Sequence, residues 1–261
     1  MPHVIAVVNQ KGGVGKTTTA VNLAAYLAAA GMRVLVVDLD PQGNATSSLG
    51  INRAGLSASM YDVVLEKATA ANATLYSERI RLHIIPSVPD LAAAEVELVN
   101  EFDRERRLLH ALKPVLAAYD YVLMDCPPSL GMLTVNALTC ATSVLVPVQC
   151  EYLALEGLGQ LTRTLGLVKQ RLNSAIEISG MVMTMFDPRT QLSSQVVAEV
   201  EKHFPGKVYK TRIPRSVRLS EAPSYGQPIL TYAPNSAGAA AYAALAQEVL
   251  QGVQAGVSSA S

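Results

Sequence analysis

The sequence contains few of the residues that define several classes of protein. Among its 261 residues there is no tryptophan, and there are only 3 cysteines and 4 histidines. The cysteines form no Cys-x-x-Cys pair and the histidines show no metal-ligand spacing, so neither a disulfide framework nor a zinc centre is predicted. Free thiols that pack as small apolar residues are typical of a reducing compartment, and we therefore expect a cytoplasmic protein.

A basic leader and long apolar runs are absent as well. No run of about 18 uncharged apolar residues occurs, so no membrane span and no membrane partner are expected. The 21 basic residues balance the 21 acidic residues, and this total gives no sign of a nucleic-acid partner. Half of the residues are hydrophobic and only 16% are charged, which excludes a disordered chain and allows a substantial core.

Short apolar runs alternate with longer helical stretches. Runs such as Val-Leu-Val-Val at 34–37 are apolar throughout and do not alternate with polar residues, as in strands buried on both faces of a parallel sheet. Strands are predicted at Val4–Val8, Val34–Asp38, Leu82–Pro86, Tyr121–Asp125, Ser143–Val148, Ile178–Met185 and Lys207–Ile213. Helices are predicted at Lys16–Ala30, Leu91–Leu116, Leu153–Leu172, Ser193–Phe204 and Ala237–Gln251. The pattern predicts a single α/β domain over residues 1–251, a mostly parallel twisted sheet with helices on both faces, and a frayed tail over 252–261.

The first predicted strand leads into a glycine-rich segment, Asn-Gln-Lys-Gly-Gly-Val-Gly-Lys-Thr-Thr at 9–18, where a helix begins. Strand, glycine-rich turn and helix are the context of a phosphate-binding loop, because backbone N–H groups and the helix dipole face the phosphates. Lys16 is expected on the β- and γ-phosphates, and the Thr17 hydroxyl on Mg²⁺. The nucleotide-binding residues predicted in this loop are Lys11, Gly12, Gly13, Val14, Gly15, Lys16, Thr17 and Thr18.

This loop departs from the ordinary phosphate loop at one position. Gln10 stands where the ordinary pattern has its first glycine, and a second lysine, Lys11, follows it. The conformation of the loop can keep the Lys11 side chain from reaching the phosphates bound in the same subunit. One solution is that Lys11 reaches the phosphates of a second subunit. The nearest competitor is a dinucleotide-binding turn with Asp38 on the ribose, but Thr18 stands where that turn needs its third glycine.

Two of the predicted strands end in acidic residues, in the segments at 38–44 and 125–129. Ligands collect outside the carboxyl ends of parallel strands, so both segments should border the phosphate loop. Either acid alone would more simply be a helix cap, but beside this loop Asp38 and Asp125 join Thr17 as predicted Mg²⁺ ligands. Asp40 lies beyond its strand and could orient the attacking water. The predicted catalytic residues are Lys11, Lys16 and Asp40.

Basic residues gather between 202 and 218, where no Asp or Glu occurs. Such a cluster can neutralise DNA phosphates without reading sequence, although alone it would more simply be a solvated face. The cluster consists of Lys202, Lys207, Lys210, Arg212, Arg215 and Arg218.

Together, the motifs resemble those of the deviant Walker ATPases, and most closely those of the ParA (Soj) partitioning branch of the MinD/ParA superfamily. The matching stretches are 11–18, 38–47 and 125–129, and the resemblance runs from Val4 to about Leu250. It implies a P-loop NTPase that uses ATP and Mg²⁺ and forms a sandwich homodimer with two nucleotides at the interface. It further implies that Lys11 crosses to the partner's phosphates, and that Asp40 supports slow hydrolysis stimulated by a ParB-type centromere-binding protein.

Two later segments resemble family blocks. Residues 184–193 resemble the segment near the adenine, with Arg189 on a DNA-binding face, and residues 213–223 resemble a block in which Arg218 matches an arginine for non-specific duplex DNA. These segments imply base contacts by Thr184, Met185 and Pro214. The implied function is ATP-dependent partitioning of a chromosome or plasmid, with nucleoid association. No helix-turn-helix segment precedes the first strand, so we expect the short form, which does not read an operator.

Other uses of this phosphate loop fit the sequence less well than partitioning does. A MinD-like membrane-positioning ATPase would need a basic amphipathic C-terminal helix, but residues 237–261 contain no Lys or Arg, and Glu248 is their only charged residue. A metabolic ligase or kinase of the dethiobiotin-synthetase type would need an acceptor motif, and none is present. An iron–sulfur reductase is a poor fit to Cys126, Cys140 and Cys150. Against a binding-only switch, Asp40 and the two lysines predict real but slow hydrolysis.

Overall fold

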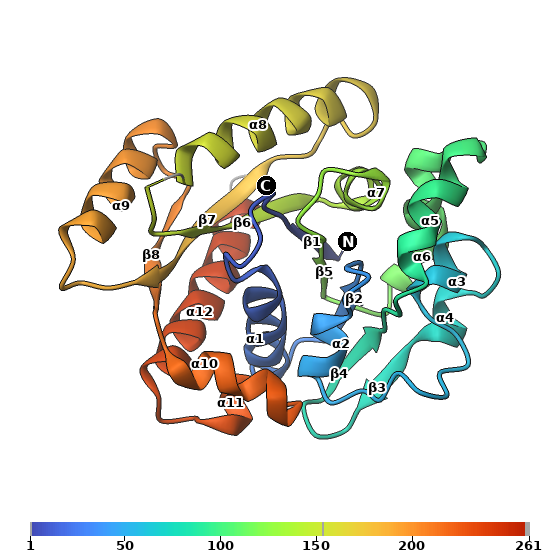
Figure 1. Cartoon of the computed structure of the whole chain (residues 1–261), viewed down its shortest axis with the longest axis horizontal. Helices are drawn as coiled ribbons and strands as arrows, with labels where there is room; N and C mark the ends of the chain where they lie inside the picture. The colour runs from blue at the N-terminus through green and yellow to red at the C-terminus, as the bar shows by residue number, and fades with distance from the viewer. Residues whose placement is uncertain (1, 153, 259–261) are drawn as a thin grey trace.

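The computed structural model describes residues 2–152 and 154–258, with side chains up to residue 252. Its centre is an eight-stranded sheet in the order β3-β4-β2-β5-β1-β6-β7-β8 (Figure 1). Only the edge strand β3 runs antiparallel to its neighbour, and every other pair is parallel. The strands are β1 (His3–Val7), β2 (Val34–Asp38), β3 (Leu75–Ser77), β4 (Leu82–Ile85), β5 (Tyr121–Asp125), β6 (Ser143–Gln149), β7 (Ile178–Phe186) and β8 (Val208–Pro214).

Helices cover both faces of this sheet, as predicted. The α-helices are α1 (Lys16–Ala29), α2 (Asn44–Ser48), α3 (Met60–Val64), α4 (Ala70–Ala73), α5 (Leu91–Glu97), α6 (Arg107–Leu116), α7 (Met132–Cys140), α8 (Ala154–Arg171), α9 (Gln191–His203), α10 (Val217–Glu221), α11 (Ile229–Tyr232) and α12 (Ala237–Ser258). Short 3-10 helices are η1 (Leu98–Asn100), η2 (Arg104–Arg106) and η3 (Ala222–Tyr225).

Two apolar cores lie on the two faces of the sheet. Along β1, Val4 and Ala6 pack into the core under α5 to α9, whereas Ile5 and Val7 pack into the core under α1 and α12 (Figure 1). Side chains that alternate between two buried faces explain why these strands are continuous apolar runs. None of the described helices is long and apolar enough to cross a membrane.

The structure corrects one long prediction. The single helix predicted over 91–116 is α5, η1, η2 and α6, because the chain turns between 101 and 103, where Asp103 has a left-handed φ of 52°. Residues 50–80, where no element was predicted, contain α3, α4 and β3. Helix α12 continues to Ser258, past its predicted end. Residue 153, where a predicted helix began, and residues 259–261 lie outside the described residues, so fraying of the tail stays a prediction.

Candidate nucleotide-binding site

The phosphate loop joins β1 to α1, and the buried side-chain amide of Asn9 holds it in place. The Asn9 side chain donates from Nδ2 to the Pro147 carbonyl at 2.7 Å and accepts from the Lys11 backbone N–H at 3.0 Å. Gly13 and Gly15 have φ values of 75° and 88°, which side chains rarely adopt. Gly15 is the N-cap of α1, so the open end of this buried helix faces the loop. The loop is therefore a preformed cradle for an anion.

Lys16 and Lys11 differ sharply in their surroundings. Lys16 is buried, its Nζ donates to the Lys11 carbonyl at 3.0 Å, and burial lowers its pKa while the charges of Asp125 and Asp40 act to raise it. The Lys11 side chain instead leaves the loop and pairs with Glu151 at 2.8 Å. Lys16 is thus directed into its own loop, and Lys11 is directed away from it.

Sequence reasoning missed Glu151. It lies two residues beyond the end of β6, at the same edge of the sheet as Asp38 and Asp125. The rule that directs attention to the carboxyl ends of parallel strands would have found it.

Asp125 at the end of β5 is a buried carboxylate without hydrogen bonds. It is fully inaccessible, and its two oxygens are the only buried polar side-chain atoms without a partner among the described residues. Burial, and then the charge of Asp38, raise the pKa of Asp125 well above its usual range. The Thr17 hydroxyl lies close enough to oppose this rise but does not meet hydrogen-bond geometry. An unpaired buried carboxylate is costly, and a cation beside Asp125 and Thr17 would satisfy it.

Asp38 pairs in register with Asp125 on the neighbouring strand, but its oxygens are engaged. Oδ2 accepts from the Thr46 backbone N–H at 2.8 Å and from the Thr46 hydroxyl at 2.6 Å, and Oδ1 accepts from the Asp40 backbone N–H at 3.2 Å. Burial raises the pKa of Asp38 to about 6. The structure therefore gives Asp38 a role in shaping the loop after β2, and its role as a metal ligand stays a prediction.

Asp40 is held in a defined turn of this loop. Its Oδ1 accepts from the Gln42 backbone N–H at 3.0 Å, and its carbonyl accepts from the Ser87 hydroxyl at 2.7 Å. It is 7% exposed, and its charge acts on both Lys16 and Asp125. The structure thus brings five predicted residues to one place: Lys16, Thr17, Asp38, Asp40 and Asp125.

A cavity of about 320 Å³ lies beside the phosphate loop. Its wall includes Thr184, Met185 and Pro214, the three residues implied to contact a base, together with Gly15 and Thr18 of the loop. The Thr184 hydroxyl donates to the Val14 carbonyl at 2.8 Å and so ties β7 to the loop. Tyr242 of α12 also lines this cavity, and no sequence motif indicated it.

Comparison with known proteins agrees with this geometry. Residues 2–178 match the protein family described as AAA domain. The chain is 55% identical over 249 residues to the sporulation initiation inhibitor protein Soj of Bacillus subtilis (strain 168), covering 95% of this chain and 98% of Soj. It is 52% identical over 249 residues to the chromosome partitioning protein ParA of Myxococcus xanthus, covering 95% and 88% of the two chains. The chain belongs to the ParA/Soj family of P-loop ATPases.

Solved structures agree on the fold of this ParA/Soj-type chain. A cobyrinic acid a,c-diamide synthase of Mycobacterium smegmatis, solved with ADP and magnesium, superposes with a TM-score of 0.87 at 39% identity, covering 98% of this chain and 97% of the other. The ATP complex of Cyanothece McdA(D38A) superposes with a TM-score of 0.85 at 21% identity, covering 96% of each chain, a likeness of fold alone. The predicted P-loop α/β fold is confirmed.

The residues predicted for DNA binding in this ParA/Soj-type chain are all exposed, but several have acidic neighbours. They are Arg189, Lys202, Lys207, Lys210, Arg215 and Arg218. Arg189 pairs with Asp187 at 2.7 Å, and Arg218 pairs with Glu221 at 3.0 Å. Lys202, Arg212 and Arg215 lie 3.6 to 4.0 Å from glutamates outside 202–218. Residues 202–218 thus contain no acid in the sequence, but acidic side chains from outside this range lie beside them on the surface.

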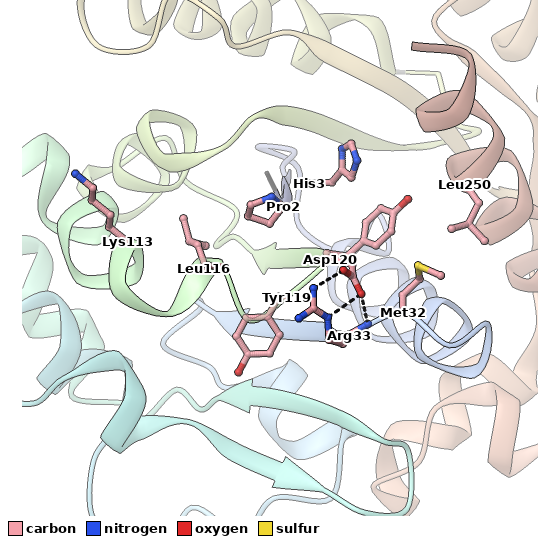
Figure 2. Close-up of a pocket in the computed structure, with 11 residues that line it drawn as sticks. Pro2, His3, Met32, Arg33, Lys113, Leu116, Tyr119, Asp120 and Leu250 are labelled. Carbon is pink, nitrogen blue, oxygen red and sulfur yellow. Dashed lines mark hydrogen bonds and ion pairs between the residues drawn. The ribbon is translucent and has the colours of Figure 1, made fainter. Parts of the chain in front are cut away.

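A larger cavity, of about 760 Å³, is lined by none of the phosphate-loop or acidic-motif residues. It opens at the amino ends of β1 and β5, where His3 and Tyr121 begin their strands, and Figure 2 shows Arg33 and Asp120 pointing toward each other within it. Their ion pair measures 2.7 Å. Ligands of parallel sheets bind at the opposite, carboxyl edge, where the phosphate loop of this ParA/Soj-type chain is found.

Proposed function

We propose that this chain is an ATP-dependent DNA-partitioning ATPase that acts in chromosome or plasmid segregation. One observation carries the proposal: the phosphate loop presents one inward and one outward lysine beside the unpartnered carboxylate of Asp125. Identities of 52% and 55% to proteins named ParA and Soj, over nearly the whole chain, support the same function. The 39% identity to a diamide synthase is lower, and it keeps a P-loop ligase as the second candidate.

ATP occupies the loop with its base in the cavity lined by Thr184, Met185 and Pro214. Lys16 and the backbone N–H groups of the loop hold the phosphates. Thr17 and Asp125 hold Mg²⁺, which neutralises phosphate charge when it is bound. Asp40 orients the attacking water, because it is the acid of this cluster that lies beyond its strand.

Lys11 serves the nucleotide of a second subunit. Its contact with Glu151 joins two partly exposed side chains, and such a pair contributes only about 0–1 kcal/mol. ATP in a partner subunit offers Lys11 more negative charge than one carboxylate does. The ATP-bound chain is therefore a homodimer, and in the absence of ATP it returns to the state with Lys11 on Glu151.

The dimer binds duplex DNA through the exposed basic residues of both subunits, without reading sequence, and it associates with the nucleoid. A ParB-type partner stimulates the slow hydrolysis and resets the cycle. A membrane role is disfavoured, since Tyr242, Leu245 and Ala246 of α12 are buried against the core and Glu248 binds the backbone of β8.

The decisive experiment measures ATP turnover of the full chain alone, with duplex DNA, and with DNA plus a ParB-type N-terminal peptide. We expect slow turnover that rises several-fold only when both are present, and none in Lys16→Ala. Turnover that is indifferent to DNA and peptide, but rises with a small carboxylate or amine acceptor, would favour the ligase instead.

A further inference from the structure

The segment over 217–232, formed by α10, η3 and α11, separates the base cavity from the predicted DNA-binding face. We call it the bridging segment. On its inner side, Leu219, Ser220 and Pro223 line the cavity of about 320 Å³. On its outer side, Arg218 is exposed and paired with Glu221 at 3.0 Å, and Glu221 also accepts from the Tyr232 hydroxyl at 3.1 Å. A shift of this segment would therefore move both a cavity wall and a DNA-binding arginine.

One buried amide ties the bridging segment to the phosphate-loop helix. Asn22 of α1 is 4% exposed and uses both ends of its side chain. Its Nδ2 donates to the Thr18 carbonyl at 2.7 Å, and its Oδ1 accepts from the Ile229 backbone N–H at 2.6 Å. Thr18 also lines the cavity, so a single side chain links the nucleotide site to α11.

Two glycines bring the bridging segment into contact with the segment after β2 that contains Asp40 and α2. A Cβ on Gly226 would lie 2.7 Å from the Gly50 Cα, and a Cβ on Gly50 would lie 3.0 Å from the Gly226 carbonyl oxygen. Both residues have positive φ, 60° and 76°. Gly50 follows α2, whose Thr46 holds the Asp38 carboxylate. The two backbones thus touch with no side chain between them, and a displacement of α2 reaches the bridging segment directly.

We propose that Asn22 and the Gly50–Gly226 contact are positioning residues that couple the nucleotide site to Arg218 within one subunit. Nucleotide in the cavity fixes the bridging segment, and the fixed segment presents Arg218 to DNA phosphates. Such coupling is reciprocal, so bound DNA tightens nucleotide binding by the same factor, which is about 5- to 150-fold in typical allosteric proteins. The inference rests on the proposed function. It adds a coupling route within one subunit to the effect of dimerisation, which pairs the DNA-binding residues of two subunits.

The test compares Gly226→Ala with Gly55→Ala. Gly55 has a φ of 85° and open space around its Cβ position, so its variant also puts a side chain on a left-handed backbone but touches no neighbour. We expect Gly226→Ala to form the ATP dimer, by sedimentation with a non-hydrolysable ATP analogue, and to bind duplex DNA at least about tenfold more weakly than Gly55→Ala. The effect of DNA on analogue affinity should also fall toward one.

A second variant guards against a folding defect in Gly226→Ala. Asn22→Ala removes both hydrogen bonds of the amide link, and Thr231→Val, which removes only a local bond to the Pro228 carbonyl, is its control. Asn22→Ala should show the same loss of coupling while it stays folded, with a melting temperature only a few degrees below that of its control, because the buried Ile229 N–H loses its acceptor. Parent-like DNA binding by folded Asn22→Ala would overturn the inference.

Amide hydrogen exchange separates this inference from the proposed function, because it needs no DNA. In the parent chain the ATP analogue should slow exchange over 217–232 several-fold, and Asn22→Ala should abolish this slowing. A parent whose exchange over 217–232 ignores the analogue would contradict the coupling, whatever its DNA binding. A parent that shows the slowing but never binds DNA would contradict the proposed function and leave the nucleotide half of the coupling standing.

Discussion

At the scale of single residues, Asp125 shows the conflict between stability and function most directly. Its buried carboxylate has no hydrogen-bond partner, and burial and the Asp38 charge raise its pKa. The folded chain therefore binds this proton more tightly than the unfolded chain does. For a carboxyl with a raised pKa, stability is lost as pH rises above the usual value of about 4.

Asp125→Asn should consequently stabilise the nucleotide-free chain while abolishing Mg²⁺-dependent ATP turnover. The gain should reach about 1–3 kcal/mol at pH 8, which is about 2–4 °C in melting temperature per kcal/mol, and it should shrink at pH 5. Thermal unfolding of parent and variant at the two pH values checks this. Equal melting temperatures at pH 8, or a gain that grows toward pH 5, would contradict the assignment of Asp125 as the destabilising charge.

Individual site residues could be predicted from the sequence where they belong to one short motif. Lys16, Thr17 and Asp125 sit in short motifs whose strand–loop–helix context fixes their direction, and the structure brings them together. Glu151 and Tyr242 belong to none of these motifs. Glu151 pairs with Lys11 of the loop, and Tyr242 of α12 lines the cavity beside the loop, only in the folded chain. Their roles depend on which strands and helices become neighbours.

At the scale of elements, the C-terminal helix and the edge strand stabilise each other. Glu248 of α12 accepts from the backbone N–H groups of Lys210 and Thr211 at 2.8 and 2.7 Å, and so occupies the open side of β8. Edge strands present unpaired backbone groups that need such cover. The only charged residue of the C-terminal stretch therefore has a structural partner.

Glu248→Ala should lower the free energy of unfolding by about 1.5–3 kcal/mol, the range for hydrogen bonds to a charged group. Its neighbour Gln247 is exposed on the same helix, and Gln247→Ala should change the free energy by less than about 0.5 kcal/mol. Urea unfolding of the two variants measures the difference. Equal unfolding midpoints would show that α12 holds β8 by apolar packing alone.

The central elements were predicted closely because β1, β2 and β5 are apolar runs buried on both faces. The break at Asp103, with its left-handed φ, was not predicted, since helical periodicity continues on both sides of it. Short elements such as α2 and η3 were not predicted, for a related reason. Helices of one turn are stabilised by what they pack against and not by their own sequence.

At the scale of the whole molecule, a net charge of zero conceals an uneven distribution. The acidic residues of the nucleotide site are buried at strand ends, and the basic residues over 202–218 lie on the surface beside scattered glutamates. In the proposed function, DNA must displace these surface carboxylates, so each subunit alone would offer a weak site. Two such sites in the proposed ATP-bound dimer would act jointly, with a large gain in affinity.

Arg218→Ala tests whether both subunits contact DNA at once. Each neutralised phosphate contributes about 0.9 to the slope of log K against log salt, so the loss of one contact per subunit should lower the slope by about 2 in the ATP dimer. Arg163→Ala, which removes an exposed arginine of α8 outside the basic cluster, should leave the slope unchanged. The measurement is duplex DNA binding across salt concentrations with a non-hydrolysable ATP analogue, with dimerisation followed by sedimentation. A slope that falls by about 1 would mean that only one subunit of the dimer faces DNA, and an unchanged slope would remove Arg218 from the interface.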